Sequence, residues 1–204
     1  MRRLLVTLIF LSLSITIHAD WDWSPVIARV ERSIVRIAIT YPGGEEGTCT
    51  GFVIKRAYVL TAHHCFGGTM TVDTFPATEV WHDEYDDLMI LHSIKIDKPA
   101  LRPSTKVLRK GLAVGALGYG FGTVEPMART GMISHPVYLF PNEWQVPGVW
   151  LIVDNLYVGG MSGGPVFDQD GRVVGIIQRT VPAAGVGVGR PISVILSAVR
   201  DYWR

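Results

Sequence analysis

The sequence predicts an all-β fold that ends in a helix. Short runs rich in valine, isoleucine and tyrosine recur along the chain, separated by glycine, proline or polar turn residues. Such spacing is typical of a β-sandwich or a β-barrel. The last segment differs, because Ile195, Val199 and Trp203 recur every fourth residue, which is the helical period. With 204 residues, 48% of them apolar and 18% charged, the chain can form one domain or two small lobes.

The formal net charge is +1, so the composition indicates neither a basic stripe nor an acidic tail. A protein that binds nucleic acid through its phosphates usually carries a basic surface. We therefore expect no nucleic-acid partner.

Residues 1–19 have the pattern of a secretory signal peptide. Two arginines precede fourteen uncharged residues, 4–17, and an aromatic, acidic stretch follows. This run is short for a membrane-spanning helix and suits the apolar part of a signal peptide, with cleavage after Ala19. Ile17 stands where a small residue is usual before the cut, so an uncleaved membrane anchor is the alternative. Either way we expect an exported chain, periplasmic or secreted, that contacts a membrane only if residues 4–17 are retained.

The first element expected after this segment is a short helix over Pro25–Arg32, with Ser24 as its N-cap. A strand-like run over 34–39 follows and ends in a glycine-containing turn. Further short β-type runs are 51–54, 58–61, 70–75, 88–91, 112–117, 130–134, 149–153, 166–167 and 172–177. The final helix is expected over 192–204, and the proline-containing stretch 97–105 is the best candidate for a crossing between two lobes.

A serine between two glycine pairs is the first functional signal. Ser162 stands in the stretch Gly159–Pro165, which leads into an apolar run. A nucleophilic serine needs a tight turn and free backbone N–H groups beside it, and glycine permits the backbone angles that this requires. Gly160 and Ser162 would supply two N–H donors to an oxyanion. The simpler interpretation is a glycine-rich hairpin turn, unless a histidine and an aspartate occur elsewhere.

Two neighbouring histidines, His63 and His64, compete for the role of a general base, since both follow the predicted strand 58–61. His82 and His92 are expected to be exposed or simply packed. From the residues alone, the choice between His63 and His64 stays open.

Asp87 is the candidate for the carboxylate that orients the base. It alone in the acidic stretch 82–87 adjoins the apolar run 88–91, and the mouth of a buried strand suits a carboxylate that stabilises an imidazolium. The alternative interpretation of 82–87 is a solvated acidic loop, with calcium binding as a weaker one.

Cys49 and Cys65 are the only cysteines and lie sixteen positions apart. An even number of cysteines in an exported chain favours a disulfide. The alternative is a zinc site formed with His63 and His64. We expect no metal, because no closely spaced cysteine pair exists and adjacent histidines on a strand point in divergent directions.

These motifs resemble those of chymotrypsin-fold serine proteases, and most of all the protease domain of the HtrA (DegP-like) trypsin-like peptidases. The resemblance covers nearly all of residues 25–200. The segments that carry it are 33–37, 51–54, 59–64, 87–91, 111–122, 131–134 and 154–175. It implies two antiparallel six-stranded β-barrels with a C-terminal helix, the first barrel within 20–104 and the second within 105–204.

The resemblance also implies a role for each candidate residue. It makes Ser162 the nucleophile, His64 the base and Asp87 the orienting carboxylate, with the N–H groups of Gly160 and Ser162 as the oxyanion hole. In chymotrypsin-like enzymes the catalytic histidine precedes a cysteine that is bonded to one sixteen residues upstream. This feature selects His64 and implies a Cys49–Cys65 bond, and it leaves His63 at a position usually filled by alanine, without an explanation.

Several departures from the family pattern bear on activation and specificity. Met161 stands where zymogen-type proteases have an aspartate, so activity should not need propeptide cleavage. Leu156 stands where a preference for lysine or arginine would require an acidic residue. Ile176, Ile177 and Gln178 would form an uncharged wall, which implies a small or medium apolar P1 residue. The chain also leaves no room after Trp203 for the PDZ module that HtrA proteins usually carry.

The resulting hypothesis is a serine endopeptidase that acts on protein or peptide substrates without a cofactor. The main alternative is a catalytically inactive binding protein with the protease fold, because fold alone does not establish function. An esterase, which would share the acyl chemistry, is a third interpretation.

Overall fold

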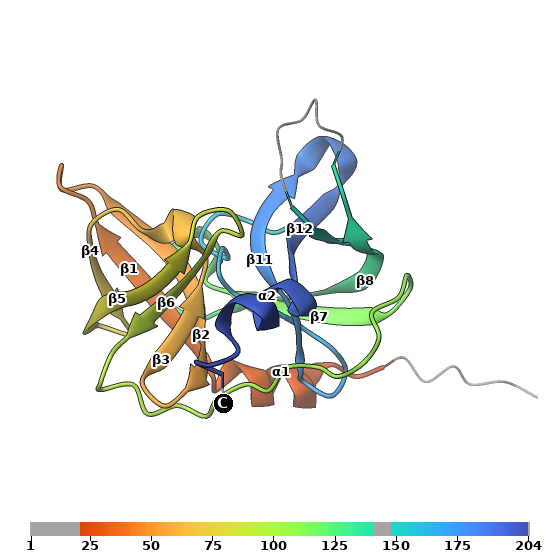
Figure 1. Cartoon of the computed structure of the whole chain (residues 1–204), viewed down its shortest axis with the longest axis horizontal. Helices are drawn as coiled ribbons and strands as arrows, with labels where there is room; N and C mark the ends of the chain where they lie inside the picture. Colours follow the sequence, from red (N-terminus) through yellow and green to blue (C-terminus); the bar gives the residue numbers. More distant parts are fainter. Residues whose placement is uncertain (1–20, 141–147, 204) are drawn as a thin grey trace, which may run out of the picture.

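The described strands close into two antiparallel β-barrels of six strands each, which lie side by side in Figure 1. The computed structural model describes residues 21–140 and 148–203. The predicted fold, two six-stranded barrels with a short C-terminal helix, is confirmed. The expected signal peptide, residues 1–19, lies outside the described residues.

The first barrel has the strand order β1-β2-β3-β6-β5-β4. Its strands are β1 (Ile34–Thr40), β2 (Glu46–Lys55), β3 (Tyr58–Thr61), β4 (Thr69–Val72), β5 (Phe75–Asp83) and β6 (Leu88–His92). Between β3 and β4 lies a short 3₁₀ turn, η1 (His63–Cys65). Strands β3 and β6 are buried almost throughout, which matches their continuous apolar sequence.

The second barrel has the order β10-β11-β12-β9-β8-β7. Its strands are β7 (Ala113–Gly118), β8 (Met127–Tyr138), β9 (Trp150–Val153), β10 (Pro165–Phe167), β11 (Val173–Val181) and β12 (Val186–Pro191). Two 3₁₀ turns, η2 (Gly120–Gly122) and η4 (Pro182–Ala184), follow β7 and β11.

Two strands, β5 and β12, have no counterpart among the expected runs. Strand β5 alternates between half-buried and exposed residues and contains Pro76, so its apolar signal is weak. Strand β12 contains Gly187 and Gly189, which lower the β-propensity of the sequence. Both glycines are required by close packing, because a Cβ atom at Gly189 would lie 1.8 Å from the Ile176 carbonyl oxygen and one at Gly187 would lie 2.3 Å from the Tyr157 ring.

The first helix, α1 (Ser24–Glu31), lies close to its expected position, but the predicted N-cap is wrong. Trp23 is the N-cap residue, and its own side chain makes no capping hydrogen bond. The Asp22 carboxylate instead accepts a hydrogen bond of 2.9 Å from the Ser24 N–H group. Ser24 therefore lies inside the helix, one position later than a capping residue.

The second helix, α2 (Ile192–Val199), is shorter than the expected 192–204. Beyond it, the Trp203 indole N–H donates to the Leu101 carbonyl at 2.8 Å, so this residue still packs against the barrels. In the part of the chain that is described, neither helix has the length and apolar content that crossing a membrane requires.

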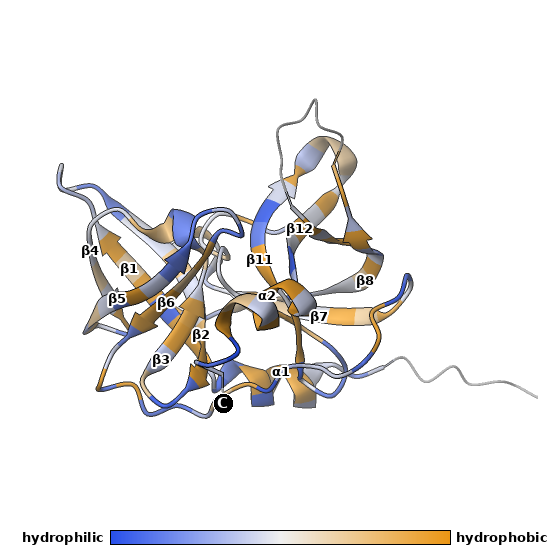
Figure 2. Ribbon diagram, viewed as in Figure 1, coloured by the Kyte–Doolittle hydropathy of each residue, from blue (hydrophilic) through white to orange (hydrophobic). Residues whose placement is uncertain are grey.

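One hydrophobic cluster joins the two barrels and both helices. It contains Phe52 from the first barrel, Phe167 and Ile176 from the second, and Val30 and Ile195 from the helices, and all five are fully buried. Figure 2 shows hydrophobic residues along strands such as β3 and in α2, and hydrophilic residues at several loop tips and in parts of β5 and β11. This shared core fixes one barrel against the other and so positions any site between them.

A disulfide joins Cys49 on β2 to Cys65 at the end of η1, as the sequence predicted. Both cysteines are buried within the apolar core of the first barrel. The bond therefore ties the turn after β3 to the wall of the barrel.

We expect replacement of both cysteines by alanine to lower the free energy of unfolding by about 3 kcal/mol, the value that loop-closure entropy gives for a loop of this length. Guanidinium denaturation of the oxidised wild type and the double variant measures the difference. The wild type unfolded in the presence of a reductant should match the variant. Equal midpoints for all three samples would contradict the prediction.

Candidate active site

His64 and Asp87 meet at the junction of the two barrels. The His64 Nδ1 atom lies 2.8 Å from Asp87 Oδ2, and the backbone N–H of His64 donates to Oδ1 of the same carboxylate, also at 2.8 Å. The Asp87 side chain is 13% exposed and that of His64 is 44% exposed. The carboxylate thus fixes the imidazole orientation and requires the proton on Nδ1, which leaves Nε2 free to act as a base.

The loop that carries Asp87 is held by residues of the second barrel. Asp87 has a φ of +54°, a left-handed conformation that aspartate tolerates better than most residues. The Gln178 side-chain amide donates to the carbonyls of Asp86 and Asp87 at 2.7 and 2.8 Å. The His63 N–H also donates to the Asp87 carbonyl, at 3.2 Å. These bonds fix a backbone conformation that would otherwise be unfavourable.

Arg190, on β12, is a second clamp on the same loop. Its guanidinium donates to the carbonyls of Asp86, Tyr85 and Val149 at 3.1, 2.7 and 3.0 Å, although the side chain is only 1% exposed. It also lies 4.0 Å from the centroid of the buried Trp150 ring, a cation–π contact.

Arg190 also forms an ion pair with the Asp86 side chain. The Asp86 carboxylate lies 3.4 Å from Arg190 Nε. Burial lowers the pKa of Arg190, and the nearby Asp86 and Asp87 carboxylates oppose that shift. Burial raises the pKa of Asp86, with Arg190 acting in the opposite direction. The Arg190 charge is therefore removed from water and the Asp86 charge partly so, and because each depends on the other, loss of either one is costly.

The backbone of the turn that contains Ser162 packs directly against the backbones of β2 and β7. Gly163 has a φ of +83°, and a Cβ there would lie 2.2 Å from the Thr50 carbonyl oxygen. A Cβ at Gly164 would lie 2.1 Å from the Leu117 carbonyl oxygen. The glycines after the serine are thus needed for contact with β2 and β7, in addition to the freedom of their backbone angles.

Two backbone N–H groups in this turn are available to bind an anion. Within residues 21–140 and 148–203, no acceptor lies in hydrogen-bond geometry to the N–H of Gly160 or Ser162. The carbonyls of the same two peptide planes are anchored. Phe121 N–H donates to the Gly159 carbonyl at 2.7 Å, and Gly164 N–H donates to the Met161 carbonyl at 2.9 Å. Because a trans peptide places N–H and C=O on opposite sides, these bonds hold both N–H groups on the other side of the turn.

Thr50, on β2, connects the turn to the first barrel. Its hydroxyl donates to the Gly160 carbonyl at 2.7 Å and accepts from the Tyr119 N–H at 2.8 Å. Its own N–H donates to the Ser162 carbonyl at 2.8 Å. One threonine therefore fixes the backbone of the turn on both sides of Met161.

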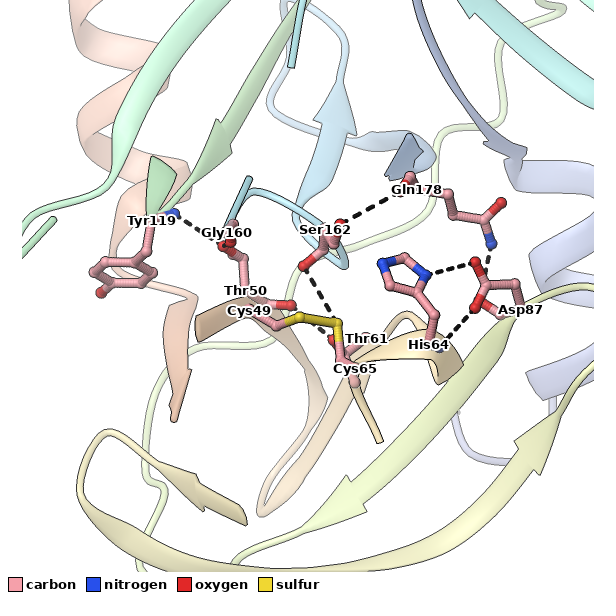
Figure 3. The surroundings of a disulfide bond; sticks show 10 residues. All are labelled: Cys49, Thr50, Thr61, His64, Cys65, Asp87, Tyr119, Gly160, Ser162 and Gln178. Atoms are coloured by element: carbon pink, nitrogen blue, oxygen red, sulfur yellow. Dashed lines mark hydrogen bonds and ion pairs between the residues drawn. A yellow bond between two sulfur atoms is a disulfide. The ribbon is translucent and has the colours of Figure 1, made fainter. Parts of the chain in front are cut away.

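The Ser162 hydroxyl itself donates to the Gln178 carbonyl at 3.3 Å. In the described residues it makes no hydrogen bond to His64, although the ring edge opposite Asp87 faces Ser162 in Figure 3. Hydrogen bonds between a nucleophile and its base are often long or poorly aligned before substrate binds, so the missing bond does not exclude this pair.

A cavity of about 170 Å³ opens beside Ser162. Its other lining residues are Tyr157, Val158, Gly159, Ile177, Gln178, Arg179 and Thr180. Of the residues expected to contact substrate, Ile177 and Gln178 line this cavity. Leu156 and Ile176 do not line it. Leu156 is instead 43% exposed, and Ile176 is buried in the core shared by the barrels.

Sequence reasoning missed several residues that shape this site. Thr50 and Phe121 hold the serine turn, Arg190 holds the Asp87 loop, and Tyr157 and Arg179 line the cavity. The sequence contains only weak indications of these residues. Arg190 is a single charge between a glycine and a proline in an otherwise apolar stretch, and no pattern indicates its partner 104 positions away.

Comparison with known proteins shows which family the chain resembles. Residues 49–176 match the profile of the trypsin-like peptidase domain. A probable periplasmic DegP-like serine endoprotease from Hahella chejuensis is 32% identical over 173 residues, which cover 78% of this chain and 36% of that protein. Serine protease Rv3671c from Mycobacterium tuberculosis is 31% identical over 168 residues, covering 76% of this chain and 42% of that protein.

The solved structures agree with the sequence matches. The active form of the M. tuberculosis Rv3671c protease superposes with a TM-score of 0.76 at 27% identity, covering 86% of this chain and 83% of that one. The chain spans well under half the length of the curated relatives named above, 36% and 42%.

We expect Arg190→Met to lower the free energy of unfolding by roughly 3 kcal/mol, because it removes the hydrogen bonds to the Tyr85, Asp86 and Val149 carbonyls and leaves the Asp86 carboxylate without its cation. Arg179→Met is the matched control, since Arg179 is exposed and its Cζ atom lies 5.0 Å from the same Trp150 ring. The control should change stability by less than about 1 kcal/mol. Urea denaturation of both variants measures the two values, and equal losses would refute the role of the clamp.

Proposed function

Because this chain belongs to the family of trypsin-like peptidases, we propose that it is a serine endopeptidase that cleaves protein substrates through an acyl-enzyme. In this proposal Ser162 is the nucleophile, His64 the general base and Asp87 the carboxylate that orients the base. The observation that carries the proposal is the His64 imidazole, bound to Asp87 on one side and facing Ser162 on the other.

The chemistry proceeds in two halves. His64 Nε2 takes the hydroxyl proton as Ser162 Oγ attacks the substrate carbonyl carbon, and the imidazolium then gives that proton to the departing amine. Water attacks the resulting ester after giving a proton to His64, and the same proton returns to Ser162 Oγ as the acid product leaves. Asp87 stays ionised throughout and stabilises the imidazolium.

The oxyanion of each tetrahedral intermediate is bound by the N–H groups of Gly160 and Ser162 in this mechanism. Their free hydrogen-bonding capacity and their anchored peptide planes support this role. Preorganised donors need no reorientation as charge develops, which is the main source of their stabilising effect. Thr50 and Phe121 are positioning residues, since they act on the turn and not on the substrate.

The cavity beside Ser162 is the proposed S1 pocket. Its volume of about 170 Å³ is similar to that of a cavity of ~150 Å³ that holds benzene, so a side chain of small or medium size fits. The lining contains Arg179 and no acidic side chain. A lysine or arginine at P1 would meet a like charge with no partner, whereas Val158, Tyr157 and Ile177 favour an apolar group.

We also propose that the chain is exported, with residues 1–19 as a signal peptide or anchor and the barrels as the two halves 20–104 and 105–204. The naming of a DegP-like relative as periplasmic supports this location.

A binding protein with the protease fold is the second candidate. The observation in its favour is the hydrogen bond from the Ser162 hydroxyl to the Gln178 carbonyl, which occupies the proton that His64 would have to take. Covalent labelling separates the two candidates, because only an activated serine reacts.

We expect a fluorophosphonate to add once to the purified protein, at Ser162, as read by intact mass. Ser162→Ala and His64→Ala should abolish the adduct, and Ser162→Ala should lower kcat for peptide cleavage on the order of a millionfold. Absence of an adduct on a folded, oxidised protein would rule out the peptidase proposal and support the binding candidate.

In a peptide library we expect cleavage after alanine, valine or leucine to exceed cleavage after arginine or lysine. The reason is that the pocket is lined by uncharged residues and by one positive side chain, Arg179. The measurement is kcat/KM for matched peptides that differ only at P1. Arg179→Glu should raise the rate after arginine relative to the wild type. A preference for arginine in the unaltered protein would contradict the assignment of this pocket.

A further inference from the structure

The imidazole of His63 points away from the proposed catalytic residues and towards β5. Its ring stacks on that of His82, with centroids 4.5 Å apart and planes 19° apart, and on Phe66 at 6.2 Å. His64, the next residue, faces Asp87 instead. Because the two neighbouring side chains diverge, they cannot bind the same metal ion. His63 can instead bind a metal together with a histidine from another strand.

His82 is held in place by a carboxylate. A register shift between Glu79 and Trp81 inserts one extra residue into β5, so that Glu79 and His82 come to the same side of the strand. The Glu79 carboxylate pairs with His82 Nδ1. A proton on Nδ1 leaves the lone pair of His82 on Nε2, directed away from Glu79. This arrangement is how proteins orient histidines that bind metals.

Glu84 supplies a third donor. One potential ligand atom from each of His63, His82 and Glu84 lies within 4.8 Å of the others. Zn²⁺ bonds of about 2.0–2.1 Å in tetrahedral geometry place ligand atoms about 3.3 Å apart. His82 and Glu84 are exposed and His63 is half-buried, so side-chain rotations can close the difference.

We propose that His63, His82 and Glu84 bind one zinc ion, with Glu79 orienting His82 and a water molecule in the fourth position. Two imidazoles and a carboxylate suit zinc and its transition-metal neighbours, whereas calcium and magnesium prefer ligand sets made only of oxygen. The site would also account for a histidine at position 63.

The position of these ligands connects the zinc site to the proposed catalytic residues. His63 directly precedes His64, and Glu84 lies three residues before Asp87. An ion that bridges His63 and Glu84 restrains the two segments that set the His64–Asp87 contact. Zinc binding should therefore slow cleavage reversibly. This effect on rate rests on the proposed peptidase function, whereas zinc binding does not.

The test is to titrate Zn²⁺ into the full chain carrying Ser162→Ala and to measure binding by isothermal titration calorimetry. We expect one saturable site that His82→Ala abolishes and that Glu79→Gln weakens roughly 10- to 100-fold. His92→Ala is the matched control, because His92 packs against Tyr58 outside the cluster, and binding should be unchanged. His64→Ala should also leave zinc binding intact.

Several results would overturn the proposal. They are the absence of saturable binding, equal affinity in His82→Ala and its parent, or loss of binding in His64→Ala, which would place the ion at the proposed triad. If His82→Ala fails to fold by circular dichroism, His63→Ala and Glu84→Gln test the same site, and unchanged affinity in both would refute it.

Activity gives a separate measurement in the wild-type chain. Zinc at a concentration that saturates the calorimetric site should lower the rate of peptide cleavage, and His82→Ala should be insensitive to the same concentration. If the wild-type rate is unchanged at saturation, the coupling to His64 is wrong. A chain that cleaves no peptide but binds zinc as expected would refute the peptidase proposal and leave the zinc site standing.

Discussion

The arrangement of the site depends on the direct contact between the backbone of the serine turn and the backbone of β2. At Gly163 a side chain would collide with the Thr50 carbonyl and with the Thr61 hydroxyl, each 2.2 Å from the Cβ position. That closeness allows Thr50 to reach the carbonyls of Gly160 and Ser162 with its hydroxyl and its N–H. Glycine at position 163 is thus a packing requirement between the two barrels as well as a conformational one.

The support between the two barrels is mutual. The first barrel holds the serine turn through Thr50, while the second holds the Asp87 loop through Gln178 and Arg190. Each half therefore fixes a functional element that belongs to the other. The contacts are long-range in sequence, so the site forms only as the two barrels dock and cannot be assembled by local structure alone.

The sequence predicted the fold class, most of the strands and the disulfide because each leaves a local pattern. Apolar runs, turn residues and cysteine spacing are local signals of this kind. Strand β12 was missed since the close packing that requires Gly187 and Gly189 also removes the β-type composition. The predicted cap at Ser24 is wrong for a different reason, because the helix already begins at Ser24, whose N–H group donates to the Asp22 carboxylate.

The candidate site was predictable only in part. The glycine-flanked serine and the histidine before a cysteine are local motifs, and the structure brings His64 to Asp87. The residues that orient them are set by contacts between strands distant in sequence. Arg190 meets a loop more than a hundred positions away, and Thr50 is an ordinary β-strand residue until the serine turn docks on it. Side-chain orientation across a strand also decided which of Ile176 and Ile177 lines the cavity.

The disulfide links two segments that contribute to the candidate site. Cys49 directly precedes Thr50, and Cys65 directly follows His64, so the bond connects the segment that anchors the serine turn to the segment that presents the imidazole. While both cysteines remain thiols, these two segments lack their covalent connection. Formation of the bond therefore adds a covalent link between two segments of the candidate site that are otherwise held together by noncovalent contacts alone.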